Sequence, residues 1–522
     1  MSASAPASGR TRRWLLLLLD LALAVAGGVL FAGASPRLAW WPLAFLGVGL
    51  LLVSIRRGGP WRAALLGAVG GLSYWCVLIS WLTLYLGPVP WLGLAGAMTV
   101  YFALSAALIS FAVTGLRALS GSAWIRLGAI PLAIACIWVA RESISAVWPF
   151  GGFSWGRVAM TQSESPFTHL VSYLGFNGLS LVVVWLVALA LELFAGLRGR
   201  LTWQRAGLRA LLVAAILAVL VLVPAWPTAT AGTLSVGAAQ GDGPAGIFDP
   251  RSPGDVLNTQ LQASQPLIGQ KMDVLVWPEG AADLSPLVDP AAADAIDHLS
   301  ARIGAPILLG TVTEQDGVYH NSAILWQAGQ GETAQYDKVH PVPFAEYMPA
   351  RDFFHLLAPD LVDLVQLDYA PGTGPSVMDV DGVPAGVMIC FDVTDDRLAD
   401  AVVREGGQLV LLPTNNADFG RTDQTFQQAA TARLRAIELG RSVVSVSTVG
   451  ITAAYAPDGS VIQELPPFEA GAFVAQVPLS QTTTPAVVLG SGLTAGVMAA
   501  AVLGIAAGVA GRVRRALLRK RG

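Results

Sequence analysis

Val387-Met388-Ile389-Cys390-Phe391-Asp392 ends an apolar, strand-like run and stands immediately before a segment with the pattern of a helix. A strand that ends where a helix begins exposes side chains at the edge of a sheet. The positive end of the helix dipole would favour the thiolate form of a cysteine placed there. A lone cysteine is also often a small buried apolar residue, so Cys390 by itself leaves both interpretations open.

Two segments upstream carry charged side chains beside apolar runs. Trp277-Pro278-Glu279 closes one such run, and Lys338 ends Tyr336-Asp337-Lys338. A carboxylate at the end of a buried strand should have a raised pKa, which suits a general base, and an ammonium stabilises negative charge on a carbonyl oxygen. Taken singly, Glu279 could equally be a loop carboxylate and Lys338 a surface residue. Together with the thiol they suggest a cysteine nucleophile with an acidic base and a cationic stabiliser.

These segments lie in a stretch, residues 230–482, that has the composition of a globular domain. Strand-like and helix-like patterns alternate along it, which predicts an α/β domain built in layers. Strands are predicted at 234–240, 272–278, 306–313, 318–326, 384–390, 408–414, 442–448 and 470–477. Helices are predicted at 254–268, 290–303, 394–405 and 422–440.

The sequence on either side of this domain is strongly apolar. The 522 residues are 54% hydrophobic and 13% charged, which excludes an ordinary soluble protein. The chain is expected to divide into an N-terminal membrane domain at 1–229 with about seven transmembrane helices, the α/β domain at 230–482, and a C-terminal helix with a basic tail at 483–522. Spans are predicted near 14–33, 38–55, 62–86, 91–116, 126–142, 170–196, 206–227 and 485–511.

Basic residues predict how these helices are oriented, because positively charged loops stay in the cytoplasm. Both termini are therefore expected to be cytoplasmic, and the α/β domain extracytoplasmic. The first span could instead be a cleaved signal peptide, since Ala32-Gly33-Ala34 resembles a cleavage site, and this would leave the later topology unchanged. The basic segments occupy alternate loops, at 10–13, 56–62, 117–126, 198–209 and 512–521.

Composition also argues against several kinds of site. Cys76 and Cys136 lie in predicted spans and leave Cys390 alone in the α/β domain, so there is no disulfide framework or zinc-ligand spacing. Five scattered histidines offer no metal cluster. The net charge of −3 gives no reason to expect nucleic acid as a partner.

The ordered set of motifs resembles the nitrilase, or carbon-nitrogen hydrolase, superfamily. With membrane segments before and after it, the chain resembles the apolipoprotein N-acyltransferase family over nearly its whole length. The resemblance implies a multi-span α-helical membrane domain and an extracytoplasmic α/β domain folded as an αββα sandwich. The matching stretches are Gln240-Gly241, Trp277-Pro278-Glu279, Tyr336-Asp337-Lys338, Pro343–Pro349, Ile389-Cys390, Asn415–Gly420 and Arg435–Arg441.

The resemblance implies roles for four residues. Cys390 would be the nucleophile, Glu279 the base and Lys338 the stabiliser of the oxyanion. Glu346 matches a second family glutamate that supports the site. No metal and no organic cofactor is implied, because a thioester on Cys390 would store the acyl group.

The implied reaction is a two-step transfer through that thioester. A fatty acyl chain would leave a membrane phospholipid for Cys390. It would then pass to the α-amine of the N-terminal diacylglyceryl-cysteine of an apolipoprotein. The expected partners are thus the phospholipid donor, the diacylglyceryl-modified apolipoprotein acceptor and the lipid bilayer, and the expected location is the bacterial cytoplasmic membrane.

Three positions depart from the family pattern. Phe391 and Asp392 stand where the family often has Tyr-Glu, so a hydroxyl is missing and the carboxylate is one carbon shorter. Asp418 stands where the family has Trp. These changes put the details of substrate contact in doubt and leave Glu279, Lys338 and Cys390 unaffected.

Two apolar segments each have two interpretations. Residues 350–370 are unusually apolar for a connection and could form a lid or acyl-chain contact, or a loop packed onto the domain. The aromatic stretch Trp148–Trp155 could line a lipid entry or could anchor the chain at the membrane interface.

Two other functions stay open. A membrane-tethered amidase would use the same three residues and pass the acyl group to water, although a tether does not need so many spans. A non-catalytic membrane protein that binds lipoproteins would explain the departures but not the intact Glu279, Lys338 and Cys390.

Overall fold

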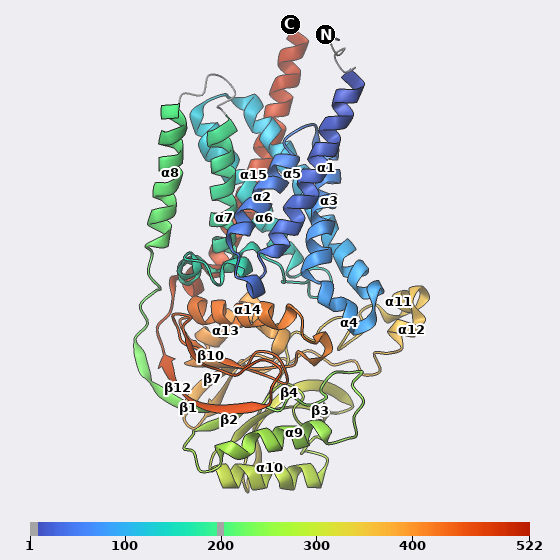
Figure 1. Ribbon diagram of the computed structural model, residues 1–522, viewed down its shortest axis with the longest axis vertical. Coiled ribbons are helices and arrows are strands. Elements are labelled where there is room, and N and C mark those ends of the chain that lie inside the picture. Colours follow the sequence, from blue (N-terminus) through green and yellow to red (C-terminus); the bar gives the residue numbers. More distant parts are fainter. Residues whose placement is uncertain (1–8, 196–202, 522) are drawn as a thin grey trace, which may run out of the picture.

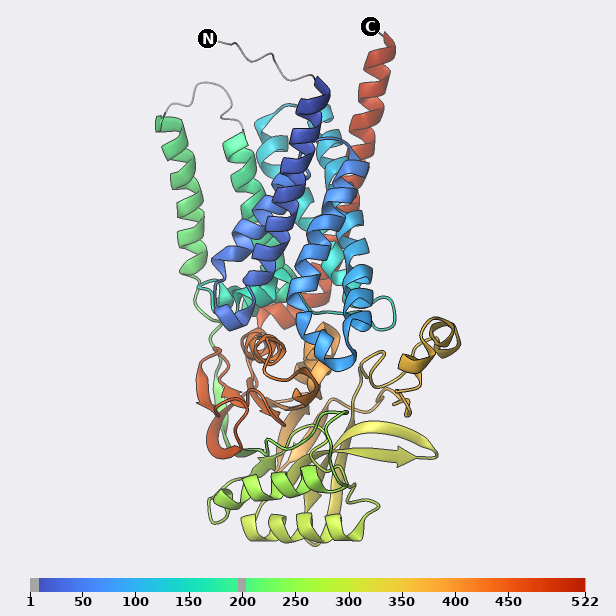
Figure 2. The same cartoon turned by 45° about the vertical axis from the view of Figure 1, so that its right-hand side comes forward.

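The computed structural model describes residues 9–195 and 203–521, and part of the basic loop predicted at 198–209 lies outside these ranges. The chain forms a bundle of long helices with an α/β domain at one end (Figure 1, Figure 2). The first helix begins, and the last helix ends, at the end of the bundle farthest from the α/β domain.

Six helical segments among the described residues are long and apolar enough to cross a membrane. The predicted spans at 38–55 and 206–227 contain shorter apolar helices, α2 (Pro42–Ser54) and α8 (Trp203–Val221). With 13 residues, α2 is about 20 Å long, whereas a bilayer core measures about 30 Å. The six are α1 (Gly9–Gly33), α3 (Pro60–Leu78), α5 (Pro88–Leu119), α6 (Ile130–Ser145) with the turn before it, α7 (Val171–Ala195) and α15 (Pro485–Arg521).

Glycines bring α5 and α15 together and so join the two membrane parts of the sequence into one bundle. A Cβ atom added at Gly115 would lie 2.0 Å from the carbonyl oxygen of Gly508, and one added at Gly511 would lie 1.9 Å from the carbonyl oxygen of Gly115. No residue with a Cβ atom fits at this separation. Small residues at helix contacts are the usual means by which membrane helices approach closely.

The α/β domain contains two six-stranded sheets. Every predicted strand overlaps an observed one, whereas β5, β6, β10 and β11 were not predicted. The first sheet has the order β12-β1-β2-β3-β4-β5, with β12 (Gly471–Ser480), β1 (Thr230–Gln240), β2 (Val274–Val276), β3 (Ile307–Gln315), β4 (Val318–Gln327) and β5 (Gly331–Asp337). The second has the order β11-β10-β9-β8-β7-β6, with β11 (Val461–Glu464), β10 (Ala453–Tyr455), β9 (Ser442–Ser447), β8 (Leu409–Thr414), β7 (Val383–Val387) and β6 (Val377–Val380).

Three apolar cores separate four layers. Side chains from both sheets, Val236 and Val444 among them, meet in the central core. Helices α9 (Asp255–Ser264) and α10 (Pro290–Ile303) pack on the outer face of the first sheet, and α13 (Asp396–Arg404) and α14 (Gln424–Leu439) on that of the second. This α-β-β-α order confirms the predicted sandwich fold of the α/β domain.

The layers differ in their distance from the membrane bundle. Helices α13 and α14 lie directly against the bundle, whereas α9 and α10 form the far end of the molecule (Figure 1). The second sheet, which includes the strand that leads to Cys390, therefore lies on the side of the domain nearer the bundle.

Candidate active site

Three of the four predicted site residues meet in one buried cluster. Glu279 follows the short buried strand β2, and Lys338 follows β5. The Lys338 Nζ atom lies 2.8 Å from Glu279 Oε1 and 2.9 Å from Glu346 Oε2. Lys338 is 1% exposed, so its ammonium is compensated by these two carboxylates rather than by water.

The surroundings keep this ammonium charged. Burial by itself would lower the pKa of Lys338, but the negative charges of Glu279 and Glu346 outweigh it and hold that pKa well above its ordinary value. Lys338 is therefore a fixed cation suited to stabilising an oxyanion.

Asn321 is a member of the cluster that the sequence did not reveal. Its Nδ2 atom donates to Glu279 Oε1 at 2.8 Å and to Glu346 Oε1 at 2.6 Å. One amide thus fixes both carboxylates around the lysine. Asn321 lies within β4 in no recognisable motif, and only the pairing of β4 with β5 brings it to Lys338.

Cys390 opens the tight turn Cys390–Thr394, which comes before α13. Its backbone has φ +50°, a left-handed conformation that costs a non-glycine residue energy and that persists only where neighbouring groups hold it. The α-helix begins at Asp396, six residues later than the cysteine. The predicted helix dipole therefore does not act directly on the sulfur.

The prediction that this position favours a thiolate is wrong for the resting site. Burial, reinforced by the negative charge of Glu279, raises the pKa of the Cys390 thiol to about 12. The charge of Lys338 and a hydrogen bond from Gln428 oppose this rise without overcoming it. The thiol is neutral at neutral pH, so a base must remove its proton for the sulfur to attack.

Asp392 anchors the nucleophile turn despite being shorter than the family's glutamate. Its carboxylate accepts hydrogen bonds from the hydroxyl of Tyr336 at 2.9 Å, the backbone N–H of His340 at 2.8 Å and that of Ile389 at 3.1 Å. Burial raises the pKa of Asp392, against the charge of Lys338. The turn that carries Cys390 is thus tied to the segment that carries Lys338.

Asp418, another departure, joins two loops beside the site. Its Oδ1 atom accepts a hydrogen bond from the backbone N–H of Ile247 at 2.7 Å. Burial raises its pKa to about 6. Here the residue holds a loop with its carboxylate, which a tryptophan could not do.

The two ends of the aromatic stretch Trp148–Trp155 have different surroundings. Phe153 and Trp155 lie nearly parallel to the ring of Phe391, at centroid distances of 6.3 and 6.4 Å. Trp155 is buried, whereas Trp148 is 64% exposed. The end of this membrane-domain segment therefore packs against the residue next to the nucleophile.

A cavity of about 230 Å³ adjoins the cluster. Its wall includes Phe391, which follows Cys390 in the sequence, and Val339, which follows Lys338. Residues of both the α/β domain and the membrane domain line it. Such a mostly apolar space suits a chain-like substrate better than a charged one. It is lined by Phe150, Gly151, Gly152, Val339, His340, Pro341, Pro343, Tyr347, Tyr369, Pro371 and Phe391.

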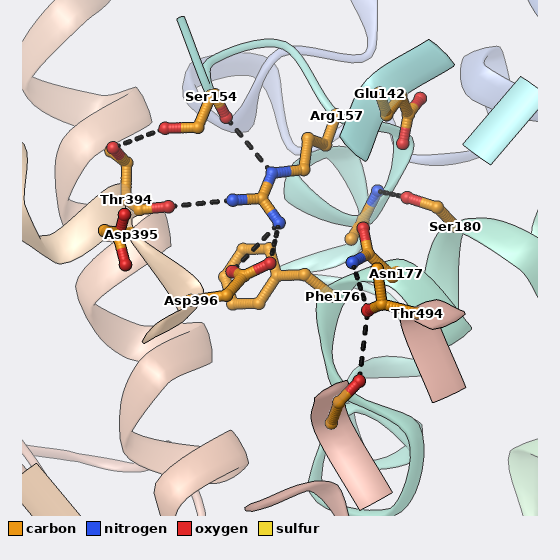
Figure 3. A network of polar contacts seen from close by, with 12 residues as sticks. Glu142, Ser154, Arg157, Phe176, Asn177, Ser180, Thr394, Asp395, Asp396 and Thr494 are labelled. Atoms are coloured by element: carbon orange, nitrogen blue, oxygen red, sulfur yellow. Dashed lines mark hydrogen bonds and ion pairs between the residues drawn. The ribbon is translucent and has the colours of Figure 1, made fainter. Parts of the chain in front are cut away.

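Arg157 connects the membrane domain to the end of the nucleophile turn (Figure 3). Its guanidinium lies 2.7 Å from Asp396 Oδ2 and donates to the carbonyl oxygen of Thr394 at 2.8 Å. Arg435 of α14 contacts the same two residues, and both guanidinium groups stack on the ring of Phe176. The turn that begins at Cys390 is therefore held at its far end by both domains.

The segment 350–370 contains two short helices, α11 (Arg351–Leu357) and α12 (Pro359–Val362). Phe354 packs edge to face on Phe344 and on Phe150 of the membrane domain, at centroid distances of 4.9 and 6.1 Å. Leu356 and Leu357 remain largely exposed. The segment projects sideways near the junction between the bundle and the domain (Figure 2).

Comparison with known proteins agrees with both halves of this architecture. Residues 27–189 match the apolipoprotein N-acyltransferase N-terminal domain, and residues 236–485 match the carbon-nitrogen hydrolase family. Among solved structures, an amidase from Nesterenkonia sp. is 19% identical, with a TM-score of 0.38, over 49% of this chain and 94% of that chain.

Two relatives match this chain over most of its length. An apolipoprotein N-acyltransferase of Mycolicibacterium smegmatis is 32% identical over 96% of this chain and 87% of its own length. That of Azotobacter vinelandii is 29% identical over 89% of this chain and 90% of its own length. With both domains matched and the relatives covered almost end to end, the chain belongs to the apolipoprotein N-acyltransferase family.

Proposed function

We propose that the protein moves a fatty acyl chain from a membrane phospholipid, through a thioester on Cys390, to the α-amine of the N-terminal diacylglyceryl-cysteine of apolipoproteins. One observation carries this proposal. A buried ammonium, Lys338, is bonded to two carboxylates beside a partly buried thiol, at the junction between the membrane bundle and an α/β domain. Family membership supports the same reaction.

In the first step, Glu279 accepts the thiol proton as the Cys390 sulfur attacks the ester carbonyl of the phospholipid. The raised pKa of the thiol requires that proton transfer accompany attack. Lys338 stabilises the oxyanion that forms. The carbon–oxygen bond of the ester breaks, the leaving alkoxide takes the proton from Glu279, and a lysophospholipid departs.

In the second step, the acceptor α-amine attacks the thioester carbonyl. Glu279 accepts a proton from the amine, Lys338 again stabilises the oxyanion, and the carbon–sulfur bond breaks. The Cys390 sulfur recovers its proton and the product is an amide. Glu346 and Asn321 keep the lysine and the base in place through both steps.

The proposed topology places both termini in the cytoplasm and residues 230–482 outside the bacterial cytoplasmic membrane, with membrane-domain boundaries at 229 and 483. The start of α1 and the end of α15 lie at the same end of the bundle, away from the α/β domain (Figure 1). The basic residues of the alternate loops gather at the ends that this topology makes cytoplasmic. Both substrates are then held in the leaflet next to the cavity.

The segment 350–370 is proposed as a contact for the lipid donor. Phe354 ties it to the cavity wall at Phe150, Leu356 and Leu357 of α11 are exposed, and α11 lies beside the end of the bundle nearer the domain (Figure 1). Moving exposed apolar side chains from water into the membrane lowers their free energy. The segment would then guide an acyl chain from the bilayer toward the cavity.

Mass spectrometry of the intact protein tests the thioester. After incubation with phospholipid, the wild type should gain the mass of one acyl chain, and hydroxylamine should remove it. Cys390→Ala should gain nothing. A wild type without any adduct, in several lipids and detergents, would contradict the proposal.

The acceptor distinguishes transfer from hydrolysis. Added to the acyl-enzyme, a diacylglyceryl-cysteine peptide with a free α-amine should gain the acyl chain, whereas its N-acetylated form should not. Release of free fatty acid at the same rate with either peptide would identify an amidase-like hydrolase instead.

A further inference from the structure

The sulfur of Cys390 has a side-chain partner that none of the sequence motifs contains. Gln428, on the buried face of α14, directs its Nε2 atom to the Cys390 Sγ atom at 3.4 Å. The thiol in turn faces the carbonyl oxygen of Asn415, at the longer distance of 4.0 Å. Gln428 is 2% exposed, so water is excluded from its side of this contact.

The neighbouring amides determine which end of the Gln428 side chain meets the sulfur. Its Oε1 atom accepts hydrogen bonds from Asn416 Nδ2 at 2.6 Å and from Gln424 Nε2 at 3.2 Å. The Oδ1 atom of Asn416 in turn faces the hydroxyls of Ser447 at 2.7 Å and Thr425 at 3.4 Å, which leaves its Nδ2 atom directed to Gln428. With Oε1 occupied by two donors, Gln428 presents its N–H group to the sulfur.

A donor at this place meets a need of the reaction. The sulfur must become an anion inside a buried site and beside the carboxylate of Glu279, both of which oppose ionisation. Lys338 supplies charge from one side, but it is already bonded to two carboxylates. A neutral N–H donor stabilises the anion without adding a charge to the site.

We infer that Gln428 is a catalytic residue that donates a hydrogen bond to the Cys390 sulfur as it attacks the donor and again as it leaves the thioester. The inference rests on the proposed role of Cys390 as nucleophile. Gln428 gives up no proton: in the first step the thiol proton passes to Glu279 while the carbon–sulfur bond forms and the ester bond breaks. In the second step the carbon–sulfur bond breaks and the same N–H group meets the departing thiolate.

Alkylation of Cys390 by iodoacetamide tests this contact without lipid or lipoprotein. The rate is measured from pH 7 to 10 on the full-length protein in detergent, by mass spectrometry of the Cys390 peptide, so that Cys76 and Cys136 do not contribute. Gln428→Met keeps the size but removes the donor, and Gln428→Glu replaces it with an acceptor. Gln262→Glu, at an exposed position of α9, is the matched control.

Loss of the hydrogen bond should raise the thiol pKa by about one unit, which lowers the thiolate fraction about tenfold. The more basic thiolate is a better nucleophile, which recovers about threefold. Alkylation below the pKa should therefore be about threefold slower in Gln428→Met at every pH, slower still in Gln428→Glu, and unchanged in the control. Loss of packing alone would expose the thiol and speed the reaction.

Each outcome decides the inference. Slower alkylation in both folded variants supports it. If Gln428→Glu does not fold, Gln428→Met decides, and if Gln428→Met does not fold, Gln428→Leu, which also lacks the donor, takes its place. Unchanged or faster alkylation in Gln428→Met overturns it, even where Gln428→Glu is slow, because charge repulsion would then explain the latter. Since alkylation needs no acyl donor, a failure of the proposed acyl transfer would appear separately, as a wild type that is alkylated but never acylated.

Discussion

Gln427 and Gln428 are consecutive residues of α14, and one binds the membrane domain while the other binds the nucleophile of the α/β domain. The Oε1 atom of Gln427 accepts the indole N–H groups of Trp155 at 2.6 Å and Trp81 at 3.1 Å, both from the membrane domain. The Nε2 atom of Gln428 donates to the sulfur of Cys390. The residue that binds α14 to the membrane domain, Gln427, is therefore directly bonded to the residue that contacts the nucleophile, Gln428.

Gln427→Met should weaken both stability and acylation. The change leaves two indole N–H groups and the carbonyl oxygen of Leu78 without their partner. Unsatisfied buried groups cost about 1–3 kcal/mol each. Denaturant unfolding should show a loss of about 2 kcal/mol or more, and thioester formation should slow because α14 is less firmly held. Gln262→Met, at an exposed position, should match the wild type. Wild-type behaviour of Gln427→Met would show that the tryptophans do not hold α14.

Arg157→Met should loosen the junction between the domains. Arg157 and Arg435 share Asp396, and the two positive charges hold the pKa of that carboxyl below its usual value despite burial. Losing hydrogen bonds to a charged group costs about 1.5–3 kcal/mol, and the cost here should not exceed this because Asp396 is 38% exposed and keeps Arg435 as a partner. The variant should unfold more easily and be cleaved faster by protease at the domain junction. Arg157→Lys should be intermediate, since lysine cannot reproduce the contacts of the guanidinium fork. The exposed Arg302→Met should behave as wild type, and equal protease resistance of Arg157→Met would contradict the prediction.

Stability should depend on pH through His340. Burial lowers the pKa of His340, but the hydrogen bond and charge of Asp395, at 3.0 Å, outweigh it, so the net pKa is raised above 6.5. A raised pKa in the folded state stabilises the protein below about pH 6.5 and stops doing so as pH rises through the folded value. Because the imidazole is partly exposed, the effect should be about 1 kcal/mol or less. His340→Gln should lose this part of the dependence between pH 6 and 8. Parallel stability curves for both proteins would contradict the assignment.

The strands and helices that could be predicted are those marked by the pattern of apolar residues along the sequence. Buried strands such as β2 and β8 are continuous apolar runs, and Glu279 and Lys338 follow strands, so the chain itself places them at a sheet end. The missed strands β5, β6, β10 and β11 are short or lie near sheet edges, where few buried apolar residues mark them. The alternation of patterns predicts only α/β layers, and the α-β-β-α order was expected from the resemblance to the carbon-nitrogen hydrolase superfamily.

The unpredicted parts of the site depend on tertiary contact. Asn321 reaches Lys338 only because β4 pairs with β5, and Gln428 reaches Cys390 only because α14 packs against the turn Cys390–Thr394. Neither residue has a local signal. The expectation of a thiolate at Cys390 failed for a related reason, because burial and the nearness of Glu279 are properties of the folded site.

Asn321→Asp should impair acylation more than folding. Asn321 now donates to both Glu279 and Glu346, and an aspartate would place a third carboxylate between them. Lost hydrogen bonds to charged groups are worth about 1.5–3 kcal/mol, so thioester formation should slow about 10- to 100-fold. Asn258→Asp, which makes the same change at an exposed position of α9, should leave the rate unchanged. An Asn321→Asp enzyme as fast as the wild type would remove Asn321 from the site.

Leu356→Ser combined with Leu357→Ser should affect use of the lipid and leave the fold intact. The two side chains are 84% and 68% exposed, so replacing them removes no packing and should not change the unfolding temperature. If the segment enters the bilayer, each lost leucine removes up to about 1.5–3 kcal/mol of burial. The concentration of phospholipid vesicles at half-maximal acylation should then rise at least about tenfold, with the maximal rate nearly unchanged. Val288→Ser is the matched control, because Val288 is equally exposed but adjoins α10 at the far end of the domain (Figure 1). An unchanged vesicle dependence would mean that α11 is only a loop packed onto the domain, and an equal shift in Val288→Ser would show that the effect comes from the general loss of apolar surface.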